Sequence, residues 1–258
     1  MDWLEALAVV GAGLGAGIVL TAIGAGSLVS FPILLAVGIS PLVANVSNTV
    51  GLVPGGVTGT WGYRGEMSGY PHLVARVALT SACGALAGAV LLLAFPPGAF
   101  EAVVPYLVLF AATLVGIQPL VSAWVRRRAE RRGTPPADDR EVMGPGLSGV
   151  ASLVGVYGGY FGAGQGVMLV AFLALGLDVP LQAINALKNL AILAANVAAT
   201  VVFVFVAPLD WAVVGLIAAG SIVGGWVGAH LGRRLSPLVF RTLVVVFGYV
   251  VAIRLIVG

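Results

Sequence analysis

The chain has very little charge and almost no thiol chemistry. Only 9% of its 258 residues are Asp, Glu, Lys or Arg, and it contains a single cysteine. One cysteine excludes an internal disulfide and any multi-thiolate metal cluster, so Cys83 is expected to be an inert packing residue. The sparse charge excludes an ordinary soluble domain, in which about a quarter of the residues are charged.

Long apolar runs take the place of the missing charge. Hydrophobic residues make up 60% of the chain, and the mean hydropathy is +1.08. Runs of roughly 18 to 25 apolar residues span a bilayer as helices, and these runs lack the polar alternation of a barrel strand. The sequence therefore predicts an all-α polytopic membrane protein. The first residues, MDWLEALAVV, have no basic region and are expected to begin the first helix rather than form a cleaved signal.

The apolar runs predict ten segments, two of which are short and follow a glycine-rich break. These breaks are AIGAGSLVSFP (22–32) and YFGAGQGVMLV (160–170). A broken helix of this kind either crosses the membrane in two passes or returns to its own side as a re-entrant hairpin. The segments are expected at 4–22, 27–38, 42–60, 73–95, 102–124, 146–160, 165–176, 180–206, 210–231 and 237–257.

The arginines fall mainly in three clusters that predict the topology. They are Arg64 with Arg76, the run between 126 and 140, and the group between 233 and 241. Short basic loops beside membrane helices mark the cytoplasmic side, which places the N- and C-termini outside. The RRRAERRG run (126–133) follows an apolar helix and has acidic neighbours, so no nucleic-acid partner is expected.

The chain also repeats. GAGSLVSFPILLAVGISP (24–41) aligns with GAGQGVMLVAFLALGLDVP (162–180), with one residue inserted before the second proline. Each half has five segments, an odd number, so the second half is expected to be inverted, as in many secondary transporters. The predicted units are a first repeat over 1–124, a cytoplasmic basic linker over 125–145 and a second repeat over 146–258.

The only lysine of the chain lies inside an apolar segment, among amides. Counted from Pro180 at about 1.5 Å per residue, Lys188 lies roughly 12 Å into the bilayer. At 100° per residue, the lysine and three asparagines share an arc of about 120°. The first half has a matching polar group about 10 Å in from the opposite face. The candidate residues are Asn185, Lys188, Asn189 and Asn196 in the second half, and Asn45, Asn48 and Thr49 in the first.

The glycine breaks supply further hydrogen-bond donors. Half-helices that begin after Gly26 and Gly164 leave N–H groups without intrahelical partners, and the positive end of the helix dipole favours an anion. Ser27 and Gln165 occupy corresponding positions of the repeat and add donor side chains. No acidic residue falls within a predicted membrane core, so the pocket is expected to bind a small anion.

These polar residues also have structural interpretations that involve no ligand, and these stay open. Lys188 can instead be a structural partner of helix carbonyls or a snorkelling residue, and the asparagines can bond between helices. The spaced glycines Gly84/Gly88 and Gly224/Gly228/Gly232 predict close helix contacts, within one subunit or in a homo-oligomer. Nothing in the sequence resembles a catalytic triad, a metal cage or a cofactor loop, so no catalytic residue, metal or cofactor is expected.

One stretch, GISPLVANVSNTVGLVPGGVTGTWGYRGEM (38–67), resembles the TauE/SafE family of bacterial and archaeal anion permeases, also called TSUP. The family pattern A-x-x-[TS]-N is matched by Ala44, Ser47 and Asn48, and a Pro-Gly stretch and a G-Y-R-x-E ending follow. The second repeat departs from the family's commoner A-x-x-T-S pattern and reads AINALKN (183–189). The resemblance implies about eight transmembrane helices in two inverted repeats, in the inner membrane of a prokaryotic cell.

The family resemblance also implies the cargo. Members move sulfur-containing anions such as sulfite, sulfoacetate or other organosulfonates. The sequence therefore predicts a secondary transporter that binds such an anion at the membrane midplane, between the two repeats, and not an enzyme. A passive anion channel and a transporter of a non-sulfur carboxylate remain the alternatives.

Overall fold

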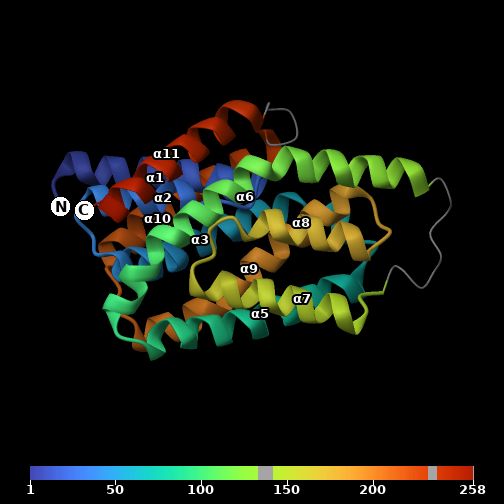
Figure 1. Cartoon of the computed structure of the whole chain (residues 1–258), viewed down its shortest axis with the longest axis horizontal. Coiled ribbons are helices and arrows are strands. Elements are labelled where there is room, and N and C mark those ends of the chain that lie inside the picture. The colour runs from blue at the N-terminus through green and yellow to red at the C-terminus, as the bar shows by residue number, and fades with distance from the viewer. Residues whose placement is uncertain (133–141, 232–236, 258) are drawn as a thin grey trace.

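A computed structural model describes residues 1–132, 142–231 and 237–257, and every regular element within these ranges is a helix (Figure 1). The predicted all-α class is therefore confirmed. The helices are α1 Trp3–Ala22, α2 Ser27–Ala36, α3 Pro41–Gly62, α4 Arg64–Met67, α5 Pro71–Ala94, α6 Pro97–Arg132, α7 Pro145–Tyr160, α8 Gln165–Gly176, α9 Leu181–Val206, α10 Trp211–Leu231 and α11 Pro237–Val257.

Among the described residues, five helices are long and apolar enough to cross a membrane. They lie within α1, α5, α6, α9 and α10, while α2, α8 and part of α11 are shorter apolar helices. Helix α6 has 36 residues and is about 54 Å long, which exceeds the ~30 Å hydrocarbon core. It continues through the arginine run to Arg132, so the first part of the segment expected to be a linker is helical. Residues 133–141 of that segment lie outside the described residues.

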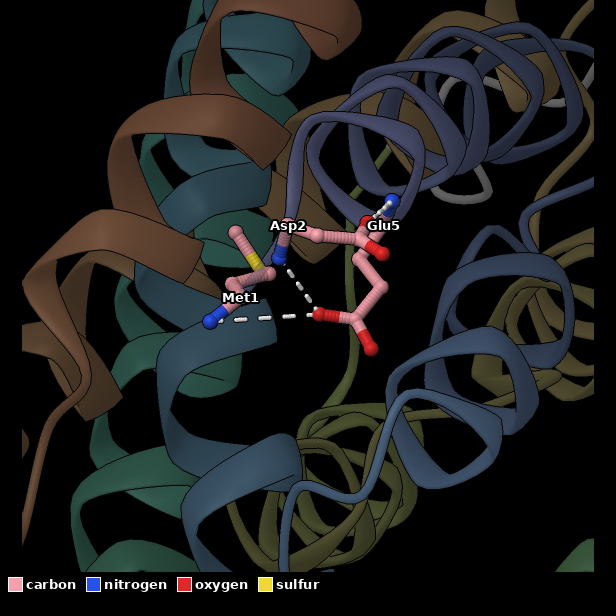
Figure 2. A network of polar contacts seen from close by, with 3 residues as sticks. All are labelled: Met1, Asp2 and Glu5. Carbon is pink, nitrogen blue, oxygen red and sulfur yellow. Dashed lines mark hydrogen bonds and ion pairs between the residues drawn. The ribbon is translucent and has the colours of Figure 1, made fainter.

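Helix α1 begins with a capping box (Figure 2). The Asp2 carboxylate accepts a hydrogen bond from the Glu5 N–H at 2.7 Å, and the Glu5 carboxylate accepts one from the Asp2 N–H at 2.8 Å. The N-terminal ammonium lies 3.9 Å from the same Glu5 carboxylate. These contacts satisfy N–H groups that the first turn of a helix leaves without partners, and so fix the start of α1.

Both glycine-broken segments fold as antiparallel hairpins. A Cβ on Gly26 would lie 2.5 Å from the Ala16 carbonyl oxygen, so α2 runs back along α1. A Cβ on Gly176 would lie 2.6 Å from Leu147, so the end of α8 returns to the start of α7. The sequence left open whether each broken segment crosses the membrane in two passes or returns to its own side, and an antiparallel hairpin is compatible with both, so this point stays a prediction.

The two halves interlock through glycine contacts between helices. Helix α1 of the first half packs along α10 of the second, and α7 of the second half packs along α5 of the first. Close approaches recur at matching positions of the two pairs. They are Gly17 to the Ser221 carbonyl and Gly224 to the Leu14 carbonyl in one pair, and Gly155 to the Ser81 carbonyl and Gly84 to the Ser152 carbonyl in the other. These spaced glycines therefore make contacts within one chain; Gly232 lies outside the described residues.

Helices α3 and α9 occupy the centre of this arrangement and contact each other. Residues 44–52 of α3 are all buried, including its asparagines. Helices α6 and α11 pack against each other, joined by a 2.8 Å hydrogen bond between the Thr113 and Tyr249 hydroxyls. Both chain termini lie at the same end of the molecule (Figure 1). The polar residues of α3 and α9 therefore lie in the interior of the bundle.

Replacement of Gly224 by Ala is expected to destabilise the protein by about 1–3 kcal/mol, because the added methyl group would overlap the Leu14 backbone. The matched control is Gly215→Ala in the same helix, where a Cβ would meet no atom within 4 Å. Alanine is the better helix former, so this control should be neutral or stabilising by up to about 1 kcal/mol. Thermal unfolding of the purified variants in detergent compares the two. Equal unfolding temperatures would contradict the packing described for α1 and α10.

Candidate functional site

The tips of the two hairpins touch each other, backbone against backbone. The Gly166 N–H at the start of α8 donates a hydrogen bond to the Gly24 carbonyl at 3.1 Å. A Cβ on either glycine would lie 2.5–2.6 Å from the Cα of the other, so no larger residue fits. Gly24 also has a φ of +86°, a conformation that side-chain-bearing residues rarely adopt. The two glycine-rich breaks, 142 positions apart in the chain at these residues, therefore meet at one point.

Asn48 ties α3 to the start of α2. The Ser30 hydroxyl donates to the Asn48 side-chain oxygen at 2.5 Å, and the Asn48 amide donates to the Ser27 hydroxyl at 3.2 Å. The structure thus brings together Asn48 and Ser27, two of the candidate residues of the first half. The neighbouring Thr49 hydroxyl bonds within its own helix, to the Asn45 carbonyl at 2.9 Å.

Two side chains of the central helices cap the hairpin of the opposite half. The Lys188 ammonium of α9 donates to the Thr21 carbonyl in the last turn of α1 at 3.1 Å. The Asn45 amide of α3 donates to the carbonyl of Tyr160, the last residue of α7, at 3.0 Å. Terminal helix carbonyls lack intrahelical partners and carry the negative end of the helix dipole, so both donors are well placed. In this conformation Lys188 is thus a partner of a helix carbonyl, the arrangement that the sequence left as an alternative to anion binding.

Lys188 is buried, and no acidic side chain of the described residues is buried with it. It is 1% exposed, and among the buried side chains of the described residues it is the one charged group. The Thr21 carbonyl is a neutral acceptor, so it satisfies one N–H of the ammonium without cancelling its charge. An ammonium has three such donors. The electropositive interior that the sequence predicts around α9 stays a prediction.

Beside Lys188 lies a cavity of about 10 Å³ that two unpartnered donors line. The Asn189 side-chain nitrogen and the Thr60 hydroxyl are buried and make no hydrogen bond with the described part of the chain. The remaining walls are Leu20, Thr21, Gly56 and Ile192. Sequence reasoning selected Asn189 but missed Thr60, because a single threonine near the end of an apolar helix carries no signal by itself.

The other predicted residues of the second half do not line this cavity. Gln165 is 1% exposed, lies against Gly158, and its side-chain oxygen has no hydrogen-bond partner among the described residues. Asn196 lies about two turns beyond Lys188 along α9 and is buried. Asn185 is half-buried, and its side chain makes no hydrogen bond that the structure shows.

The N–H groups at the start of α8 already have hydrogen-bond partners in this conformation. Gly164 has a φ of +75° and precedes the first helical residue. The next three N–H groups donate to the carbonyls of Gly162, Gly24 and Gly164. In the other hairpin, the N–H groups of Leu28, Val29 and Ser30 bond to the carbonyls of Ala25 and Gly26. Anion binding by the helix starts after Gly26 and Gly164 therefore stays a prediction, and it requires these turns to open.

Comparison with known proteins points to membrane transport. A family model described as sulfite exporter TauE/SafE matches residues 9–255. The chain is 28% identical over 244 residues to the probable membrane transporter protein ORF9 of a Sinorhizobium species, covering 93% of this chain and 88% of the relative. It is 22% identical over 237 residues to a probable membrane transporter protein of Haemophilus influenzae, covering 90% and 87%. No solved structure matches the chain.

Substitution of Asn48 by Leu should destabilise the protein by about 1–3 kcal/mol, because it leaves the buried Ser30 hydroxyl without its acceptor. The adjacent Thr49→Val is the matched control. Its hydroxyl bonds only within α3, so the loss should be below about 1 kcal/mol. Thermal unfolding of both variants without added anion measures the difference, and a larger loss for Thr49→Val would refute the role given to Asn48.

Proposed function

Because the chain belongs to the sulfite exporter TauE/SafE family, we propose that it is a secondary transporter of small sulfur-containing anions. The substrates in this proposal are sulfite, sulfoacetate or other organosulfonates. The observation that carries the proposal is the buried Lys188, whose charge no acidic residue among the described buried side chains neutralises. Ionisable residues inside a membrane protein mark substrate or ion paths, and a cationic side chain there favours an anionic substrate.

The proposed binding region lies where the hairpin tips meet α3 and α9. Its charge comes from Lys188, and its uncharged donors come from amides and hydroxyls on both halves. Support for this placement comes from the bond between Lys188 and the α1 end and from the Asn48–Ser27–Ser30 cluster. The proposed contacts are Lys188, Asn185, Asn189 and Asn196 of α9, Asn45, Asn48 and Thr49 of α3, and Gly26, Ser27, Gly164 and Gln165 of the hairpin tips.

We further propose that the two halves are inverted repeats with about eight transmembrane helices. In this proposal α3, α5, α6, α9, α10 and α11 each cross the membrane once, and the hairpins α1–α2 and α7–α8, which each enter and leave on one side, count as the remaining two. The matching glycine contacts support this proposal, because α1 packs against α10 in the same way as α7 packs against α5. Transporters with inverted repeats bind substrate between the repeats and move one against the other.

The proposal favours transport over a passive channel for a structural reason. The cavity beside Lys188 holds only about 10 Å³, and the two hairpin tips touch backbone to backbone. A channel requires a continuous path, whereas an alternating-access transporter passes through closed conformations of this kind. The coupling ion is outside the proposal.

The topology is tested by cysteine labelling. With Cys83 replaced by Ser, single cysteines are introduced at the exposed Ser40, between α2 and α3, and at the exposed Ser68, between α4 and α5. The positive-inside rule places Ser40 outside and Ser68, near Arg64, in the cytoplasm. A membrane-impermeant maleimide added to intact cells should label only S40C, and S68C should react only after the cells are opened. Labelling of S68C in intact cells would reverse the proposed orientation.

The function is tested in proteoliposomes with Lys188→Met. The wild-type protein should show saturable uptake of sulfite or sulfoacetate that exchanges with internal substrate. The uptake rate of the variant should be at least about tenfold lower than that of the wild type, because a buried charged hydrogen bond contributes roughly 1.5–3 kcal/mol. The control is Arg64→Gln, an exposed cation on the Trp61 ring, with uptake unchanged.

Three results would reject the sulfur-anion transporter. Non-saturable current through the wild-type protein would indicate a channel. Saturable uptake of acetate or other carboxylates with none of sulfite or sulfoacetate would indicate a carboxylate transporter. Uptake that is equal in the wild type and Lys188→Met would remove Lys188 from the mechanism.

A further inference from the structure

The small cavity next to Lys188 is lined by one polar residue, Thr60, that the proposed function does not use. Two buried donors, the Asn189 side-chain nitrogen and the Thr60 hydroxyl, border it and have no partner in the described structure. Asn189 is 5% exposed and Thr60 is 7% exposed, so bulk water does not compensate them. We propose that this cavity is the subsite for one oxygen atom of the transported oxyanion, and that Thr60 determines its binding together with Asn189. This inference rests on the proposed function.

The chemistry of the lining favours an oxyanion. Buried polar groups in proteins are nearly always hydrogen-bonded, so two orphaned donors beside one cavity require a common acceptor. An anionic oxygen accepts several hydrogen bonds at once, and such charge-assisted bonds are the strong ones. The nearby ammonium of Lys188 adds charge of the right sign, since the Thr21 residue that lines the cavity is also its acceptor.

The size of the cavity limits what enters it. About 10 Å³ is close to the minimum that accommodates one water-sized group, so a single oxygen atom fits and a complete sulfite does not. The remainder of the anion must lie toward the neighbouring Lys188 once the closed packing loosens. Leu20 and Ile192 form apolar walls, which keep the local dielectric low and strengthen each bond.

The lining also joins the two halves of the chain. Thr21, Gly56 and Thr60 come from the first half, and Asn189 and Ile192 come from the second. An oxygen bound to both Thr60 and Asn189 therefore bridges α3 and α9. Occupancy of the cavity then favours the conformation in which these helices are in contact. Substrate binding and closure of the two halves are thereby coupled, as expected when a ligand binds one conformation better than another.

The test measures equilibrium binding of sulfite and of sulfoacetate to the purified full-length protein by titration calorimetry. Thr60→Val and Asn189→Leu each remove one donor at nearly constant volume, so each should weaken binding by roughly ten- to a hundredfold. Thr60→Ser retains the hydroxyl and should bind within about threefold of the wild type. Ser81→Ala is the matched control, because Ser81 is also buried and unpartnered but does not line the cavity, and its affinity should be unchanged.

Two outcomes would overturn the subsite while leaving the proposed function intact. One is sulfite binding that Lys188→Met abolishes but Thr60→Val and Asn189→Leu leave unchanged. The other is a structure with bound sulfite in which the cavity holds only a water molecule. If the wild-type protein binds neither sulfite nor sulfoacetate, the proposed function fails first. Each variant is compared only when its unliganded unfolding temperature and elution volume match those of the wild type. Thr60→Val and Asn189→Leu are independent variants, so the test remains decisive if one of them does not fold.

Discussion

The contact between Gly24 and Gly166 is the constraint on which the rest of the structure depends. It joins the tips of two hairpins from opposite halves, and it holds only because neither residue has a side chain. With the tips in contact, each hairpin presents the end of its long arm to the central helix of the other half. Lys188 then reaches the end of α1, and Asn45 reaches the end of α7. A bulkier residue at either tip would separate the parts that build the polar interior.

Close backbone approach at small residues also stabilises the rest of the bundle. In lipid there is little hydrophobic gain from pairing two apolar helices, so packing of small residues supplies much of the association. The chain has 37 glycines, and many of those in α1, α5, α7 and α10 lie where two helices approach closely. Glycine content that would weaken a soluble helix here permits the contacts that stabilise the fold. Function and stability therefore depend on the same residue type, at the hairpin tips and along the helix contacts.

The sequence predicted the helices well and their spatial relations less well. Hydropathy located the apolar segments because each must be about as long as the membrane is thick. Helical spacing placed Lys188 and its asparagines on one face, and Lys188 and Asn189 are indeed buried together. It could not predict that Thr21, 167 residues away, is the acceptor of Lys188, since that pairing depends on how the hairpin returns. Thr60 was missed for the same reason: only its three-dimensional neighbours distinguish it from other threonines.

The partner of Lys188 explains how a charge can be kept ready for a ligand inside a membrane. An isolated ammonium in a dry interior is very costly, and a carboxylate partner would lower that cost but cancel the charge. A backbone carbonyl at a helix end is a compromise, because it accepts a hydrogen bond and carries only a partial negative charge. In the proposed function, this bond stabilises the empty site and leaves Lys188 free to exchange the carbonyl for an anion. An anion that recruits Lys188 also removes the cap of α1, so binding at the centre acts directly on the hairpin whose tip holds the two halves together.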